Sequence, residues 1–167
     1  MSTSPVVKAR IASPEGQALL ARVVQFAQAA GEAAQGSPGS SELSVGGRSV
    51  AAIPGGMCDK FARQIQELAM EITEGSWQFR ELTAAQTEHK LIIDNRQIGG
   101  CIPGAVGCWD DGSVGHIVTY IGSGYVAENT SGTRGNPSRP GTKITKLDDV
   151  IAAHGGDPGR WYYAGSL

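Results

Sequence analysis

The chain has 167 residues, of which 40% are hydrophobic, and its 14 Lys and Arg against 16 Asp and Glu give a net charge of −2. This length is enough for a single domain with one hydrophobic core. A near-neutral charge without a basic tract argues against nucleic acid as a partner, and no apolar segment approaches the roughly 20 residues that span a membrane.

The first predicted helix covers residues 14–30. Ser13 is a typical N-cap and Pro14 a typical first-turn residue, and Gly31 is a typical helix end. The apolar residues of this segment recur at helical spacing; they are Leu19, Leu20, Val23, Val24 and Ala27. We therefore expect one long amphipathic helix near the N-terminus.

Residues 32–47 are rich in Gly, Ser, Ala and Pro, which favours a surface loop. We expect residues 1–54 to form a helix and a Gly/Ser-rich extension that packs on, or precedes, a catalytic domain of residues 55–167. Glu15 and Gln17 interrupt the apolar run that a signal peptide needs. A classical signal peptide is therefore not expected, and we expect synthesis in the cytoplasm.

Two further helices are predicted before the middle of the chain. Residues 58–72 carry apolar side chains at helical spacing, namely Phe61, Ile65, Leu68 and Ile72. Residues 83–94 also favour a helix, although the run 91–93 is equally typical of a strand.

The second half of the chain is rich in short β-prone runs separated by Gly- and Asp-containing turns. The expected strands are residues 105–109, 115–121, 125–129, 143–145 and 161–164. Residues 147–154 are expected to form one short helix among them. Helices followed by strands indicate an α+β fold, with the N-terminal helices packed on a central antiparallel sheet of about five strands.

Cys58 is the candidate nucleophile, because it opens the predicted helix 58–72. A helix N-terminus and a nearby imidazole both stabilise a thiolate, and the first amides of a helix are placed to bind an oxyanion. Gly55 and Gly56 precede it and permit a tight turn of the backbone.

His116 is the candidate general base and acid, and the hairpin after it decides which residue orients it. A three-residue loop at Gly122–Gly124 puts Glu128 on the face of His116, whereas a two-residue loop inverts that face and presents Asn129 instead. We favour Glu128, since a carboxylate also stabilises the imidazolium. Asn129 is the alternative third member.

The other reactive side chains are interpreted as structural. Cys101 and Cys108 are close enough in sequence to form a disulfide if the backbone permits it, but we interpret them as packing residues. His89 and His154 are expected at the surface or at a helix end. The cysteine spacing is unsuitable for zinc, and neither a metal nor an organic cofactor is expected.

The order of these elements resembles the papain-like cell-wall hydrolases of the NlpC and CHAP type. The resemblance covers roughly residues 55–167 and rests on four segments: Cys58-Asp59-Lys60-Phe61, Pro103-Gly104-Ala105-Val106, Gly115-His116-Ile117-Val118 and Tyr125-Val126-Ala127-Glu128-Asn129. The closing segment Arg160-Trp161-Tyr162-Tyr163-Ala164-Gly165 is similar to the last NlpC strand. Asp59 stands where NlpC members carry Ser, which looks more like the CHAP type.

This resemblance implies a cysteine peptidase or amidase that cleaves an amide bond in peptidoglycan through Cys58, His116 and Glu128. Without an encoded export signal, such an enzyme would reach the wall or periplasm by a non-classical route. An inhibitor or immunity protein is a further partner that such an enzyme could have. Two alternatives are an acyltransferase or deamidating toxin of the same fold, and a catalytically inert binding module.

Overall fold

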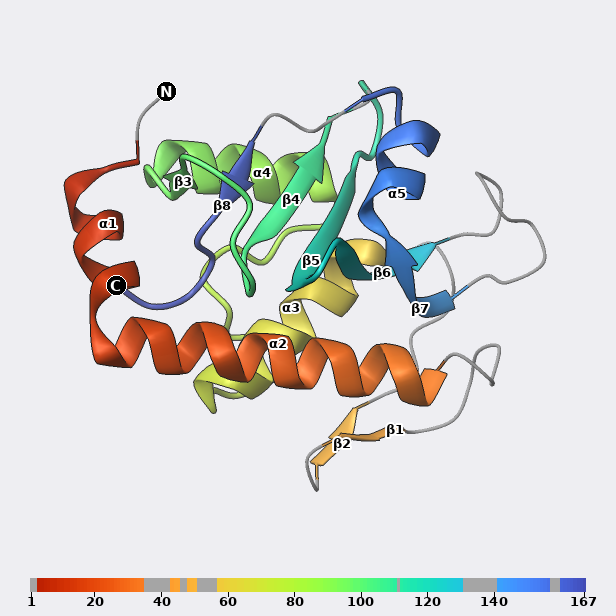
Figure 1. Cartoon of the computed structure of the whole chain (residues 1–167), viewed down its shortest axis with the longest axis horizontal. Helices are drawn as coiled ribbons and strands as arrows, with labels where there is room; N and C mark the ends of the chain where they lie inside the picture. Colours follow the sequence, from red (N-terminus) through yellow and green to blue (C-terminus); the bar gives the residue numbers. More distant parts are fainter. Residues whose placement is uncertain are drawn as a thin grey trace.

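The computed structural model of the protein describes residues 3–34, 43–45, 48–50, 57–110, 112–130, 141–156 and 160–167. In this part of the chain, five helices surround a six-stranded antiparallel sheet, and a two-stranded hairpin lies beside them (Figure 1). The helices are α1 (Pro5–Ala12), α2 (Pro14–Ala34), α3 (Cys58–Met70), α4 (Ala84–Ile93) and α5 (Leu147–Ala153). The strands of the large sheet are β3 (Gln97–Ile98), β4 (Val106–Trp109), β5 (His116–Gly122), β6 (Tyr125–Thr130), β7 (Gly141–Lys146) and β8 (Trp161–Tyr162). The hairpin consists of β1 (Leu43–Val45) and β2 (Arg48–Val50).

The large sheet has the strand order β3-β8-β4-β5-β6-β7. Strands β4 to β7 form an antiparallel meander, and β8 returns from the C-terminus to pair with the free edge of β4. The predicted α+β class is therefore confirmed, and all five predicted strands lie in this sheet. The sixth strand, β3, makes only two residue pairs with β8, and a segment that short carries no detectable periodicity.

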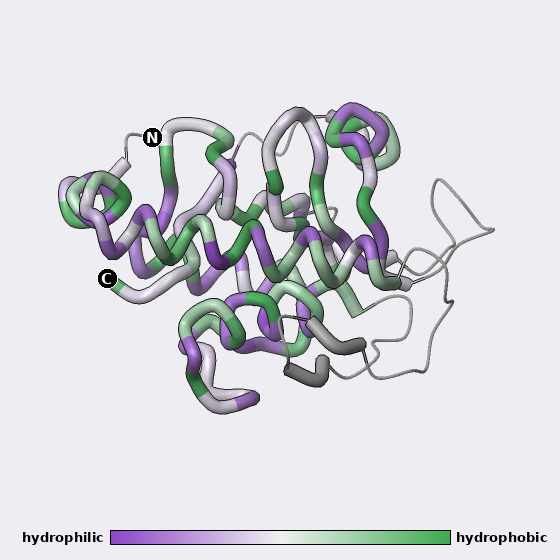
Figure 2. The backbone as a smooth tube through the Cα atoms, turned by 60° about the horizontal axis from the view of Figure 1, so that its bottom comes forward, coloured by the Kyte–Doolittle hydropathy of each residue, from purple (hydrophilic) through white to green (hydrophobic). Residues whose placement is uncertain are grey.

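Helix α2 begins at Pro14 as predicted, and the Ser13 hydroxyl accepts a hydrogen bond from the Gly16 amide. The prediction that it ends at Gly31 is wrong, because the helix continues to Ala34. A Cβ on Gly31 would lie 2.6 Å from Cγ1 of Ile144, so this glycine permits close packing on β7. Figure 2 shows the alternation of hydrophilic and hydrophobic residues along α2.

The N-terminal third contains more regular structure than its composition predicts. Helix α1 was not expected; Ser4 caps it and Pro5 begins it, but Val7 is its one buried residue, so it has no apolar stripe. Within the predicted loop of residues 32–47, the structure describes the end of α2 and the strand β1. Residues 35–42, 46 and 47, and the pair Gly55 and Gly56, lie outside the described residues.

Helix α3 is the most enclosed helix of the described fold, and it contacts α2, β5, β6 and α4. Phe61 and Ile65 are 2% and 0% exposed and belong to the larger hydrophobic core, which also contains Val23 of α2. The helix begins at Cys58 as predicted but ends at Met70 instead of Ile72, because Glu71 adopts the left-handed conformation with φ 58°. The core thus fixes the helix that carries the thiol.

Both faces of the central strands are covered. Residues 116–119 of β5 are all buried, and neighbours along the strand fall into different core clusters, with Ile117 in one and Val118 in the other. Helix α4 contributes Leu91 to the cluster of Ile117, which is why residues 91–93 are helical. The strand alternative for that run is wrong. Within the described part of the chain, no helix is both long enough and apolar enough to cross a membrane.

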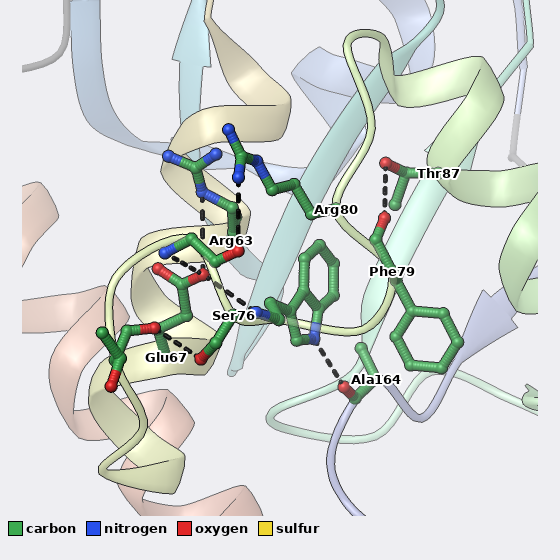
Figure 3. A network of polar contacts seen from close by, with 10 residues as sticks. Arg63, Glu67, Ser76, Phe79, Arg80, Thr87 and Ala164 are labelled. Carbon is green, nitrogen blue, oxygen red and sulfur yellow. Dashed lines mark hydrogen bonds and ion pairs between the residues drawn. The ribbon is translucent and has the colours of Figure 1, made fainter.

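The segment between α3 and α4 is fastened to α3 by Glu67 (Figure 3). The Glu67 Oε1 atom accepts hydrogen bonds from the amides of Gly75, at 2.8 Å, and Trp77, at 3.1 Å. The indole of Trp77 in turn donates to the carbonyl of Ala164, at 3.0 Å, which joins the segment to the C-terminus. These contacts hold in place a segment that forms one wall of the cleft described below.

Gly115 fixes the entry of the chain into β5. It has φ 72°, and a Cβ there would lie 2.8 Å from the carbonyl oxygen of Trp109 and 2.9 Å from the amide of Ala85. Both obstacles are backbone atoms, which cannot move aside without disturbing β4 or α4. The glycine before His116 is therefore required by backbone conformation and by space.

We predict that Gly115→Ala lowers the free energy of unfolding by about 2–4 kcal/mol, since left-handed strain and a backbone clash add together. Gly112→Ala is the matched control, because Gly112 has φ 78° but nothing within 4 Å of its Cβ position. It should cost about 1 kcal/mol. Urea unfolding of both variants gives the comparison, and equal losses would show that crowding at Gly115 is unimportant.

Candidate active site

The thiol lies at the first residue of α3, where the helix is anchored to the sheet. Met57 is the N-cap and makes no side-chain capping bond, but its own amide donates to Oδ1 of Asn129 on β6, at 2.9 Å. Asn129 also donates from Nδ2 to Thr142 on β7, at 3.2 Å. Asn129, the alternative third member, thus anchors the start of the helix that carries Cys58. The Cys58 side chain is partly exposed.

His116 is the first residue of β5 and is 6% exposed. Its Nε2 atom lies 2.8 Å from Oε2 of Glu128, and it also forms a side-chain hydrogen bond with Cys58. Because Glu128 occupies Nε2, Nδ1 is the ring nitrogen left for the thiol. The structure therefore brings together the three residues that the sequence analysis selected, from α3, β5 and β6.

The hairpin between β5 and β6 has the shorter of the two predicted turns but the strand register of the longer one. Gly122 pairs with Tyr125, which leaves a two-residue turn of Ser123 and Gly124. A bulge between Tyr120 and Gly122 then inserts one extra residue into β5 and restores the pairing Tyr120 with Val126. Continued along the ladder, this register puts Glu128 on the face of His116, as favoured above.

The charges of His116 and Glu128 depend on each other. Burial alone would lower the pKa of His116, but its hydrogen bonds to Cys58 and Glu128 and their negative charge raise that pKa to about 9. Burial alone would raise the pKa of Glu128, and the hydrogen bond and positive charge of His116 lower it below the usual value. At neutral pH the pair is an imidazolium beside a carboxylate.

An open cleft of about 500 Å³ gives access to this site, and Cys58 and His116 both line it. Its walls carry charges of both signs, from Asp59, Lys60, Arg63 and Glu81. Three exposed apolar side chains also line it, namely Met57, Leu82 and Val114. The cleft is thus suited to a polar ligand that also offers some apolar surface.

Asp59, the neighbour of Cys58, is a buried acid of the cleft that the sequence analysis assigned no role. Burial raises its pKa to about 6, against the opposing effects of a hydrogen bond with Thr87 and the charge of Arg63. Its Oδ1 atom has no hydrogen-bond partner among the described residues. An ionisable carboxyl therefore lies next to the nucleophile candidate.

His154 occupies the end of α5, and the sequence interpretation of this residue was incomplete. It is the C-cap of α5, as a helix-end role predicts, but it is half-buried and lines the cleft. Its ring stacks on His116 with centroids 4.5 Å apart and planes at 8°. Only the pairing of distant segments creates this contact, so no local signal could have revealed it. His89 lies on the exposed surface of α4.

The remaining thiols lie outside this cleft. Cys108 is buried in β4 and carries a free thiol, so it forms no bridge with Cys101. Burial raises the pKa of Cys108 well above its usual value, which suits a packing residue. No group of three or more His, Cys, Asp or Glu side chains suited to a metal occurs among the described residues.

No protein-family model, curated protein or solved structure matches this chain. The assignment of the site therefore rests on its own geometry: a thiol at a helix N-terminus, an imidazole bonded to it, and a carboxylate bonded to the imidazole.

The coupled charges predict a pH-dependent stability. A group whose pKa rises from 6.5 to about 9 on folding stabilises the native state fully below pH 6.5, and this stabilisation is lost as the pH rises through 9. We expect the free-energy difference between wild type and His116→Gln to shrink by roughly 3 kcal/mol over this range. Urea unfolding at a series of pH values measures it.

The matched control is His89→Gln, which removes an exposed histidine from α4. Its difference from wild type between pH 6.5 and 9 is the reference for removal of one histidine. A His116→Gln difference that stays constant across this range would mean that His116 gains no proton affinity on folding.

Proposed function

We propose that the protein is a cysteine hydrolase that cleaves an amide bond, with Cys58 as nucleophile, His116 as general acid and base, and Glu128 as the residue that orients the imidazole. The observation that carries this proposal is the hydrogen-bonded chain from the partly exposed Cys58 through the buried His116 to the buried Glu128, which opens on the cleft. A structural histidine needs neither a thiol on one nitrogen nor a carboxylate on the other.

The first half of the reaction forms a thioester. The thiolate of Cys58 attacks the carbonyl carbon of the amide, and the C–N bond of the resulting tetrahedral intermediate breaks. Protonated His116 gives its Nδ1 proton to the departing nitrogen, so the amine leaves neutral. Throughout the reaction, Glu128 accepts a hydrogen bond from the Nε2–H group and keeps the ring in one orientation.

The second half regenerates the enzyme. Neutral His116 takes a proton from a water molecule in the cleft, and the hydroxide equivalent attacks the thioester carbon. The C–S bond then breaks, which releases a carboxylic acid and returns Cys58 to the thiolate beside an imidazolium. The reaction needs no redox partner, because the substrate and water supply every atom of the products.

The start of α3 supports this chemistry electrostatically. The first amides of a helix have no acceptor within the helix, and the N-cap Met57 supplies no side-chain capping bond. These amides and the positive end of the helix dipole favour negative charge near Cys58. They are suited to stabilise both the thiolate and the oxyanion of the tetrahedral intermediate.

For the substrate we propose the peptide part of peptidoglycan, and for the fold the papain-like NlpC/CHAP type. The resemblance in the order of the Cys58, His116 and Glu128 segments supports both proposals. A cleft with Asp59 and Glu81 on the one hand and Lys60 and Arg63 on the other also fits a peptide that bears carboxylates and amines. Such a substrate would be met in the cell wall or the periplasm.

The test is digestion of purified peptidoglycan by wild type and Cys58→Ala, with mass analysis of the released fragments. We expect wild type to release fragments that gain one water per cleaved amide, and Cys58→Ala to lose at least about 10³-fold in rate. Fragments joined to an added amine would indicate acyl transfer instead of hydrolysis.

Cys101→Ala is the matched control, since Cys101 is also partly exposed but does not line the cleft. It should retain wild-type activity. Equal rates for wild type and Cys58→Ala would remove Cys58 from the reaction, and no release by wild type would exclude peptidoglycan as the substrate.

A further inference from the structure

The face of the His116 ring is covered by a second histidine. His154 stacks on it with ring centroids 4.5 Å apart and an interplanar angle of 8°, which is a nearly parallel arrangement. The edges of the same imidazole are occupied by Glu128 and Cys58. Contacts from α3, β6 and α5 thus surround a ring that enters the cleft from β5.

His154 is itself held in place by the fold. Its amide donates to the carbonyl of Val150, at 3.0 Å, and Val150 is 2% exposed in the larger core. Trp109 packs against its ring with centroids 5.5 Å apart. The Trp109 indole also donates to the carbonyl of Gly156, at 2.6 Å, which fixes the turn directly after His154. The ring of His154 is therefore held in one position by the fold.

We infer that His154 is a positioning residue, whose stacked ring holds His116 in the rotamer that joins Cys58 at one nitrogen and Glu128 at the other. The inference rests on the function proposed above and extends it to α5. A strand histidine turns about two side-chain bonds, and the hydrogen bonds to Cys58 and Glu128 act at the edges of its ring and not on its faces, through which the ring would swing out of its plane. The ring of His154 blocks that movement on one side.

The stack also suits the charged form of His116. An aromatic face stabilises a cation that lies against it, and the nearly parallel stack puts the ring of His154 against His116 in this way. The groups that face His116 are the thiol of Cys58 from α3, the carboxylate of Glu128 from β6, and the rings of Trp109 from β4 and His154 from α5. His154 is the one among them that supplies a parallel face.

The test compares His154→Ala, which removes the ring, with His154→Phe, which keeps a flat ring but has no nitrogen. The readout is the rate of alkylation of Cys58 by iodoacetamide from pH 5 to 9, followed by peptide mass analysis. We expect His154→Ala to slow alkylation at neutral pH about fivefold and to shift its pH profile towards higher pH. His154→Phe should stay within about twofold of wild type.

His89→Ala is the control for loss of a histidine, and thermal unfolding of every variant separates loss of positioning from loss of the fold. If His154→Ala unfolds, His154→Gln takes its place, since it keeps a polar side chain without a planar ring. A wild-type rate and pH profile in the alanine or glutamine variant would overturn the inference. A phenylalanine variant as slow as the alanine variant would also overturn it, because the ring nitrogens and not the stack would then matter.

This readout needs no substrate, so the two proposals fail separately. Slow alkylation in His154→Ala together with Cys58-independent digestion of peptidoglycan would keep the positioning role and remove the proposed function. Unchanged alkylation together with Cys58-dependent digestion would do the reverse.

Discussion

The hydrogen bond between His116 and Glu128, 2.8 Å long and almost fully buried, is the contact on which the candidate site depends. Burial penalises an isolated charge on either residue. Contacts with Cys58 and Glu128 together keep His116 protonated, and His116 in turn keeps Glu128 ionised. The same bond fixes which edge of the imidazole meets Cys58. An exposed pair at this distance would contribute little, since water would screen it.

Three backbone features bring the parts of this contact together. Gly115 allows the chain to pass between Trp109 and Ala85 just before the imidazole. The bulge at the end of β5 sets the face on which Glu128 emerges. The Asn129 amide oxygen fastens the N-cap of α3, so the helix that carries the thiol is tied to the strand that carries the carboxylate. Each feature constrains geometry and leaves the chemistry to the side chains.

Sequence patterns predicted the parts of the fold that have strong periodicity. Helix α3 could be predicted because its apolar residues face a core, and the start of α2 because Ser13 and Pro14 mark a helix N-terminus. Helix α1 buries only Val7 and β3 makes only two residue pairs, so neither leaves a pattern to detect. The end of α2 was misjudged because a glycine required for packing on Ile144 has the same appearance as a helix terminator.

The candidate site was predictable to the extent that it follows from local rules. The position of Cys58 and the face of His116 follow from helix and strand periodicity, and the choice of Glu128 depended on the number of residues in one turn. The sequence allowed either a two-residue or a three-residue turn. The hairpin has the two-residue turn, and the bulge at Ile121 gives the rest of the strand pair the register expected for the three-residue turn. The places of His154 and the buried Asp59 in the site could not be predicted from the sequence. Only tertiary contacts place His154 on His116 and enclose Asp59.

The most direct test of the central claim is the pKa of His116, measured by NMR titration of its imidazole in wild type and in Cys58→Ser. A serine hydroxyl does not ionise in this pH range, so it cannot supply the negative charge of a thiolate. If Cys58, His116 and Glu128 act as one coupled unit, the pKa should be about 9 in wild type and clearly lower in the serine variant. An identical pKa in both proteins would show that the thiol and the imidazole are not coupled, and the proposed catalytic unit would not exist.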